Sequence, residues 1–229
     1  MDKDFALKVS SYIRIDPQQI AREEAELIYL KGLFESSIAD RILFKGGTAL
    51  RLIYKSPRFS EDLDFSITGA IAFGEFEKIV TSITRTDERF SIKDLASKYY
   101  TNIAQIRIKE PWFDRAFSMK IEVSKRVGQE KEADIVNMLV ESPATNISLI
   151  VKSFTLERIL VDKLNAIKER KMPRDIFDIW YICQKTQKSF DLKNFGYPKG
   201  KMRQELRKFL PTGFYPIVED LERLNAQGI

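Results

Sequence analysis

The segment from Ile42 to Tyr54 restricts the fold of this chain more than any other. A short apolar run, Ile42-Leu43-Phe44, stops at Gly46-Gly47, and the residues after Thr48 resume with apolar side chains at helical spacing. This pattern predicts a strand, a glycine turn and a helix in immediate succession. Thirteen residues, Ala49 to Glu61, then lead to a second apolar run at 63–67. That length fits a helix of about two turns followed by a loop, so the two strands belong to one unit.

The rest of the chain divides into an early part that mixes helices and strands and a late part that is helical. In the early part we expect helices at residues 16–37 and 73–83 and strands at 104–108, 117–124 and 147–151. The two strands at 104–108 and 117–124 alternate apolar and polar residues, which predicts an antiparallel pair. In the late part we expect helices at 156–170 and 173–185 and two further segments after Pro198 and Pro211. The fold class is therefore α+β, with a mixed sheet.

Composition removes several classes of chemistry. The chain has no histidine and one cysteine, Cys183, so Ser-His-Asp and Cys-His catalysis, histidine-ligated metal sites and internal disulfides are all excluded. Carboxylates, lysines, arginines, hydroxyls and oxygen-preferring metals remain. A net charge of +5 is a weak indication of polyanionic partners. No stretch reaches the roughly 20 apolar residues that span a membrane, so no membrane partner and a cytoplasmic location are expected.

Asp62 and Asp64 form a D-x-D pair at the start of the second strand. Alternation puts both side chains on one face, where their oxygens can bind hard cations such as Mg²⁺ or Mn²⁺. The pair alone is weak support, because glycosyltransferases and phosphatases use the same tripeptide. Gly46-Gly47-Thr48 strengthens it, because backbone N–H groups and a hydroxyl at a helix start can cradle a triphosphate. The alternative is a glycine turn that only reverses the chain.

Three further residues are candidates for the same site. Glu122 lies on the polar face of the strand at 117–124 and is the best third carboxylate, unless it simply faces solvent. Lys163 falls in the middle of an apolar helical stripe, which favours a lysine facing an anion in a cleft over a structural one. Asp175, like Asp178, follows Pro173 near a helix start, where a carboxylate also stabilises the helix dipole.

Together these residues resemble the AbiEii/AbiGii toxin family of nucleotidyltransferases, within the DNA polymerase β-like superfamily. The resemblance covers about residues 40–185 and is carried by the segments 44–50 and 58–65, by 156–170 with Lys163, and by Arg174, Asp175 and Asp178. It implies that residues 1–150 form a nucleotidyltransferase core, which includes an N-terminal helix. Residues 151–229 would form a helical region that completes the active-site cleft. It also implies the toxin of a toxin–antitoxin or phage-defence pair, with a separately encoded antitoxin.

The resemblance gives each candidate residue a role. Asp62, Asp64 and Glu122 would bind Mg²⁺ or Mn²⁺, while Gly46, Gly47, Thr48 and Arg58 would hold the triphosphate of an NTP. Lys163 would neutralise phosphate charge, and Asp175 would orient Lys163 or a nucleotide hydroxyl. Some family members add nucleotides to tRNA 3′ ends, so the expected acceptor is RNA. Transfer to a protein hydroxyl and a catalytically silent RNA- or protein-binding module remain the alternatives.

Overall fold

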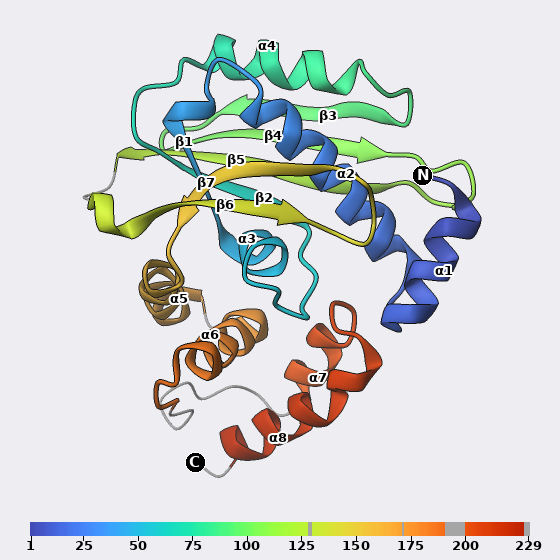
Figure 1. Cartoon of the computed structure of the whole chain (residues 1–229), viewed down its shortest axis with the longest axis vertical. Coiled ribbons are helices and arrows are strands. Elements are labelled where there is room, and N and C mark those ends of the chain that lie inside the picture. The colour runs from blue at the N-terminus through green and yellow to red at the C-terminus, as the bar shows by residue number, and fades with distance from the viewer. Residues whose placement is uncertain (128–129, 171, 191–199, 227–229) are drawn as a thin grey trace.

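The computed structural model describes residues 1–127, 130–170, 172–190 and 200–226. A seven-stranded mixed sheet with the order β3-β4-β5-β2-β1-β7-β6 forms its centre (Figure 1). The strands are β1 Ile42–Lys45, β2 Asp62–Ile67, β3 Phe90–Ser97, β4 Thr101–Ile108, β5 Phe117–Val127, β6 Ile135–Glu141 and β7 Ser148–Phe154. The helices are α1 Lys3–Ile13, α2 Pro17–Phe34, α3 Gly46–Leu52, α4 Phe73–Thr84, α5 Leu156–Arg170, α6 Pro173–Thr186, α7 Lys201–Leu206 and α8 Tyr215–Ala226. The expected α+β class is confirmed.

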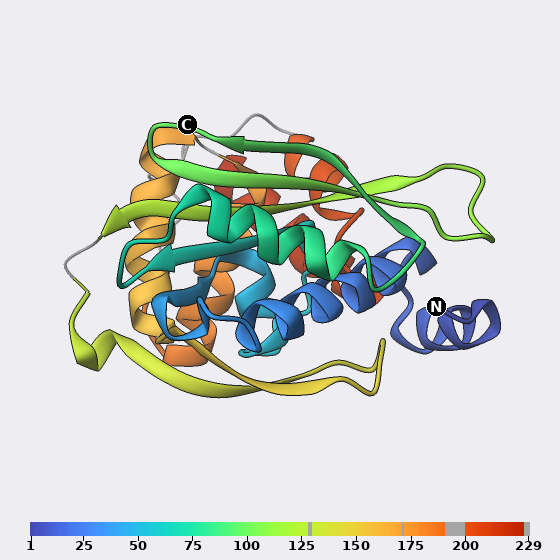
Figure 2. The ribbon, with the colours of Figure 1, turned by 90° about the horizontal axis from the view of Figure 1, so that it is seen from above.

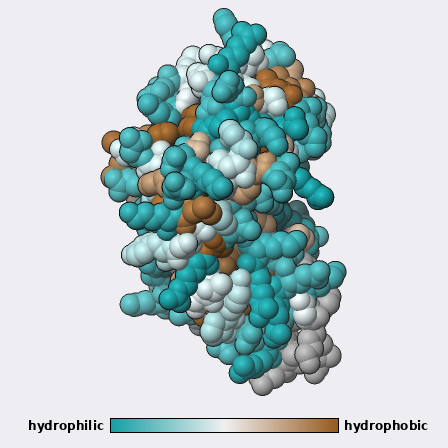
Figure 3. All heavy atoms as spheres, turned by 90° about the vertical axis from the view of Figure 1, so that its right-hand side faces the viewer, coloured by the Kyte–Doolittle hydropathy of each residue, from teal (hydrophilic) through white to brown (hydrophobic). Residues whose placement is uncertain are grey.

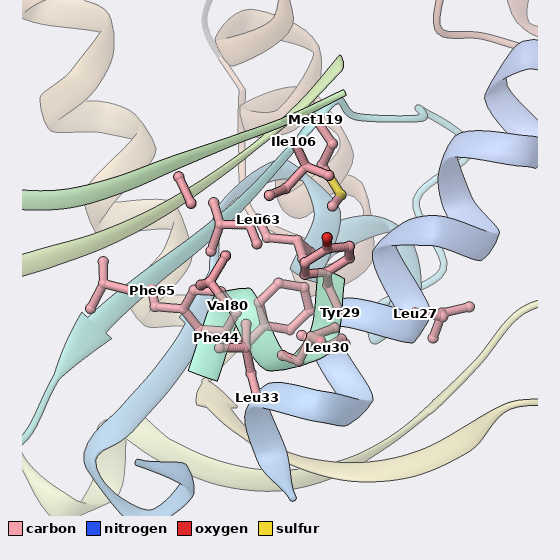
Figure 4. Packing of buried hydrophobic residues seen from close by; sticks show 14 of the residues in the cluster. Leu27, Tyr29, Leu30, Leu33, Phe44, Leu63, Phe65, Val80, Ile106 and Met119 are labelled. Carbon is pink, nitrogen blue, oxygen red and sulfur yellow. The ribbon is translucent and has the colours of Figure 1, made fainter. Parts of the chain in front are cut away.

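Two layers of helices sandwich the sheet. Helices α2 and α4 lie over one face, while α3 and the helices of the C-terminal part lie on the other side (Figures 1 and 2). The main hydrophobic core fills the space under α2 and α4, where Leu63 and Phe65 of β2 pack with Leu30 and Leu33 (Figure 4). Because strand side chains alternate between faces, Asp62 and Asp64 must point to the opposite side of the sheet.

The strand pairing places β2 in the middle of the sheet. β2 runs antiparallel to β1 on one side and parallel to β5 on the other. β4 and β5 form the expected antiparallel pair, with Ile108 opposite Phe117. A parallel contact between Phe44 and Ser153 joins β1 to β7, so the sheet is mixed as expected.

Local signals explain where α2 begins and where it ends. The Asp16 side chain accepts a hydrogen bond from the Gln18 amide at 2.7 Å, and Pro17 occupies the first turn, as the sequence predicts. The helix ends at Phe34, three residues before the expected end at Ser37. The Ser36 hydroxyl donates to the Leu33 carbonyl there, a local bond that competes with continued helix.

Three elements are absent from the sequence prediction: α1, β3 and β6. α1 buries only Ala6 and Ser10, so its apolar stripe is weak. β3 is an edge strand with a register shift between Ile92 and Asp94, which breaks the alternation that would reveal it. β6 is the other edge strand. Its exposed Leu139 is apolar on the solvent side, which obscures the alternation of apolar and polar residues.

The C-terminal helices pack around a second hydrophobic core under α3. β7 crosses the expected boundary at 150/151, and the helical part begins at Leu156. The Tyr54 hydroxyl donates to the Phe154 carbonyl at 2.6 Å, and the Tyr181 hydroxyl donates to the Tyr54 carbonyl at 2.7 Å. These bonds hold the helical part against the end of α3. α7 and α8 correspond to the two expected late segments, although Pro198 lies outside the described residues.

The surface of the end that carries α1 is mainly hydrophilic, with apolar residues in small separate groups (Figure 3). None of the described helices is both long and apolar enough to cross a membrane.

Candidate active site

The three predicted carboxylates lie on one face of two neighbouring strands. In the parallel β2–β5 ladder, Asp62 is opposite Lys120 and Asp64 is opposite Glu122. All four side chains therefore share the face that is turned away from the main core. Asp64 and Glu122 line a pocket of about 600 Å³ between this face and α5. The expected proximity of Glu122 to the D-x-D pair is confirmed.

The surroundings of the Asp64 carboxylate oppose its negative charge. Burial raises the pKa of Asp64, and the neighbouring negative charges of Asp62 and Glu122 raise it further. The backbone of Gly46 lies directly against its carboxylate, because a Cβ at this positive-φ glycine would overlap Asp64 Oδ2. The glycine turn and the D-x-D carboxylates are thus adjacent, as the thirteen-residue spacing predicts.

Lys120 is a site residue that the sequence prediction missed. Its Nζ lies 2.8 Å from Glu122 Oε2 and 3.7 Å from Asp62 Oδ2. Partial burial would lower the pKa of Lys120, but the hydrogen bond to Glu122 and the charge of Asp62 outweigh it and raise that pKa. Alternation along β5 indicates that Lys120 shares a face with Glu122. Its contact with Asp62 depends on the strand register, which only the folded chain provides.

The donor set suits a hard divalent cation. Carboxylate oxygens on adjacent strands are the ligands that Mg²⁺ and Mn²⁺ prefer, and the raised pKa of Asp64 marks an anion that a cation would stabilise. Within the described residues no three acidic or thiol side chains converge on one point. The Lys120 ammonium instead bridges Glu122 and Asp62, so a metal ion would have to compete with this internal cation.

The structure revises the direct roles expected for Thr48 and Arg58. Thr48 is fully buried, and its hydroxyl donates to the Asp62 carbonyl at 2.5 Å, which ties α3 to β2. Arg58 is 2% exposed and lies behind Gly47, where a Cβ would overlap its Nη2 and approach Ser60 Oγ to 2.7 Å. Neither side chain lines the pocket, because both are committed to bonds that position the glycine turn.

A network of ion pairs joins α5, α6 and Arg58. Lys163 Nζ is 2.9 Å from Asp175 Oδ1 and 2.7 Å from Asp178 Oδ2. Arg58 donates to both oxygens of Asp178, at 2.7 and 2.8 Å, and Arg170 donates to both oxygens of Asp175, at 2.9 and 3.0 Å. Both aspartates are fully buried. Three cations thus surround two carboxylates, which leaves one positive charge in excess.

Lys163 sits at the border between this network and the pocket. It is 8% exposed and contributes to the pocket wall, as its position in the apolar stripe predicts. Its ammonium group is held by the two aspartates, so Asp175 orients Lys163 as expected, and Asp178 does so equally. The structure thus shows Lys163 as an ion-pair partner of two aspartates, and its contact with an anionic ligand stays a prediction.

The remaining pocket wall adds residues that the sequence did not single out. Arg158 and Asp162 of α5 form an ion pair at 3.2 Å, and burial raises the pKa of Asp162. Lys45 ends β1 opposite Asp64 and also lines the pocket. The helical period places Arg158 and Asp162 on one face of α5. That this face meets the carboxylates is a tertiary property.

Comparison with known proteins identifies the family of the chain. The sequence profile described as "Nucleotidyl transferase AbiEii toxin, Type IV TA system" matches residues 28–211. The chain belongs to this family. It is therefore a nucleotidyltransferase toxin, with a nucleotide as substrate and a separate antitoxin as partner. The matched AbiEii region contains the acidic face, by which we mean Asp62, Asp64 and Glu122 on β2 and β5. It also contains the glycine turn and the ion network.

Solved structures share the AbiEii fold. The crystal structure of JHP933 from Helicobacter pylori is 21% identical with a TM-score of 0.62, and the match covers 93% of each chain. MenT4, a nucleotidyltransferase toxin from Mycobacterium tuberculosis H37Rv, is 14% identical with a TM-score of 0.55, covering 92% of this chain and 84% of MenT4. At these identities the likeness shows the fold alone. No curated protein sequence matches the chain.

Proposed function

We propose that this AbiEii protein transfers a nucleotide from an NTP to the 3′-hydroxyl of an RNA, with a tRNA as the acceptor, in a reaction that needs Mg²⁺ or Mn²⁺. One observation carries the proposal: Asp64 and Glu122 face the same pocket in register, with Asp62 on the same strand face and Gly46 against Asp64. Membership of a nucleotidyltransferase toxin family supports this reading of the carboxylates. The cytoplasm is the proposed compartment.

The carboxylates define the reacting centre of the proposed reaction. Asp62, Asp64 and Glu122 would hold the divalent cations, which supply charge stabilisation on the phosphate and ease ionisation of the attacking hydroxyl. The RNA 3′ oxygen forms a bond to the α-phosphorus, the bond from that phosphorus to the bridging oxygen breaks, and pyrophosphate leaves with the electron pair. The hydroxyl proton passes to Glu122, whose 35% exposed side chain returns it to solvent.

The glycine turn and the ion network act by position. Gly46 provides backbone without a side chain beside Asp64, so a phosphate group can approach the carboxylates closely. Arg58 and Thr48 fix the turn from behind through Asp178 and the Asp62 carbonyl. The network has one positive charge in excess, and Lys163 is the member that we assign to the phosphates at the pocket wall. This charge stabilises the triphosphate and the leaving pyrophosphate.

A labelling experiment tests the proposal. Purified protein is incubated with each α-³²P-labelled NTP, Mg²⁺ and total RNA, and the labelled species are separated on a denaturing gel. Label should enter RNA, and both EDTA and either Asp62→Ala or Asp64→Ala should abolish it. Asp114→Ala, an exposed aspartate on the loop between β4 and β5, serves as the matched control and should transfer normally. Normal transfer by both D-x-D variants would overturn the proposal.

Two alternative outcomes correspond to the other functions considered. Label that enters protein and survives ribonuclease would identify a protein hydroxyl as acceptor, with the same carboxylates at work. Absence of label from RNA and protein with all four NTPs and either metal would indicate a silent binding module.

A further inference from the structure

The turn between β3 and β4 presents two tyrosines to solvent. Lys98 and Thr101 exchange backbone hydrogen bonds of 2.8 and 3.4 Å, so Tyr99 and Tyr100 are the two central residues of the turn. Two-residue hairpin turns usually contain Asn, Asp or Gly, and neither tyrosine adopts a positive φ. The side chains are 83% and 51% exposed. Turn geometry and core packing therefore do not account for two aromatic residues at this position.

Contacts around the turn hold the rings in a defined arrangement. The rings of Tyr99 and Tyr100 meet edge to face with centroids 4.4 Å apart, and the Arg126 guanidinium lies 4.2 Å from the centroid of Tyr100. The Lys125 amide donates to the Tyr100 carbonyl at 2.7 Å, and Lys125 Nζ donates to Ser97 Oγ at 3.1 Å. The turn is thus tied to β5, the strand that carries Glu122.

The Tyr100 ring borders the candidate active site, and Tyr99 is its neighbour in the turn. Tyr100 and Arg126 line the same pocket as Asp64 and Glu122. In the β4–β5 ladder Ile103 is opposite Glu122, so Tyr100 lies three residues, about 10 Å, along the sheet from the carboxylate. The β3–β4 turn, the end of β5 and α5 lie at the same end of the molecule in both views (Figures 1 and 2).

The chemistry of this rim matches single-stranded RNA. Exposed aromatic faces stack on bases of any sequence, and arginine and lysine bind the phosphates between them. Lys98 precedes the two tyrosines, and Lys125 and Arg126 of β5 contact the turn, so three cations lie beside the rings. Protein interfaces are also enriched in tyrosine and arginine but are depleted in lysine, so Lys98 and Lys125 favour RNA over a protein partner.

We propose that Tyr99, Tyr100 and Arg126 form a stacking platform for the terminal bases of the RNA acceptor, which directs its 3′-hydroxyl towards Asp64 and Glu122. The inference rests on the proposed function, because it names the site that receives the acceptor of that reaction. Arg126 covers one face of Tyr100, and the largely exposed Tyr99 ring is available to a base.

Fluorescence anisotropy of a 3′-unpaired, fluorescein-labelled RNA oligonucleotide tests the platform with the full chain in EDTA, so that binding is measured without turnover. The double substitution Tyr99→Ala/Tyr100→Ala should weaken RNA binding about 5- to 150-fold, the range for loss of stacking on one base. Tyr99→Phe/Tyr100→Phe keeps both π-faces and should bind within about twofold of wild type. Arg126→Ala should lower the slope of log Kd against log salt by about 0.7, the value for one phosphate contact on a single strand.

Matched controls separate the platform from general effects. Tyr12→Ala removes an 88% exposed tyrosine on α1, at the opposite end of the molecule, and should leave RNA binding unchanged. The affinity of a fluorescent NTP should change far less than the RNA affinity, because Gly46 and Lys163, which the proposed function assigns to the triphosphate, are unchanged in every variant. Melting temperatures should also agree, since every substituted side chain is exposed.

The possible results distinguish the platform from the proposed function. RNA affinity of the double alanine variant equal to wild type would overturn the platform, even if the wild type labels RNA. Failure of the wild type to bind RNA, with label entering protein, would overturn it as well. An RNA affinity that depends on the platform, together with no nucleotide transfer to any acceptor, would support the platform and refute the proposed function.

Discussion

The Arg58–Asp178 ion pair offers a quantitative test of what holds the glycine turn in place. Arg58 is 2% exposed and Asp178 is fully buried, and the pair is bidentate at 2.7 and 2.8 Å. Asp178→Asn leaves the guanidinium buried without its carboxylate, and Arg58→Met leaves Asp178 with Lys163 alone. Loss of one partner of a buried pair costs about 3–5 kcal/mol. For a chain of this length each single variant should melt about 6–20 °C below wild type.

The double variant decides whether the cost belongs to the pair. Arg58→Met/Asp178→Asn removes both charges, and Lys163 keeps Asp175 as a partner. Its free energy of unfolding should therefore resemble that of one single variant, whereas additive costs of about 6–10 kcal/mol would remove most of the stability of a typical domain. Urea denaturation of the four proteins measures the coupling. Arg223→Met, in the exposed pair with Asp220, is the control and should leave stability unchanged.

The pH dependence gives a second measure of the same pair. Burial opposes ionisation of Asp178, but the charges of Arg58 and Lys163 outweigh it and hold its pKa below the ordinary range. A depressed folded-state pKa contributes stability above the unfolded pKa of about 4 and loses it as the pH falls through the folded value. The stability difference between wild type and Asp178→Asn should therefore shrink below about pH 4. Additive costs in the double variant, or a difference that does not change with pH, would refute the reasoning.

Three further predictions concern the acidic face and the glycine turn. Asp64→Asn should abolish transfer and raise the melting temperature at neutral pH, because it removes a partly buried charge whose pKa is raised. A lower melting temperature would contradict this. Lys120→Met leaves two carboxylates without their internal cation, so added Mg²⁺ should raise its melting temperature more than that of wild type; equal shifts would show that Lys120 does not compete with the metal. Gly47→Ala forces Arg58 away and should lower the free energy of unfolding by about 1–3 kcal/mol, with loss of transfer. Gly74→Ala, which has open space around it, should not destabilise the protein, and equal stabilities of the two variants would count against the close approach of Arg58 to Gly47.

Several parts of the fold and the site were predictable because they depend on local patterns. The run before Gly46-Gly47, the alternation on either side of Asp62 and Asp64, and the Asp16-Pro17 cap each act over a few residues. The same holds for the helices predicted at 156–170 and 173–185, which the structure shows at Leu156–Arg170 and Pro173–Thr186. Edge strands β3 and β6 escaped prediction because a bulge and exposed apolar residues obscure their alternation.

The amino-acid sequence by itself determined which residue types can act here: without histidine and with one cysteine, chemistry rests on carboxylates, cations and backbone. It also determined that Asp62 and Asp64 share a face, since that follows from the strand period. Only the tertiary structure decided that Lys120 joins the carboxylates, that Arg58 pairs with Asp178, and that the tyrosine turn borders the pocket. These contacts join segments up to 120 residues apart. These contacts depend on the register between strands and on the packing of α6 near α3. Neither leaves a local pattern in the amino-acid sequence.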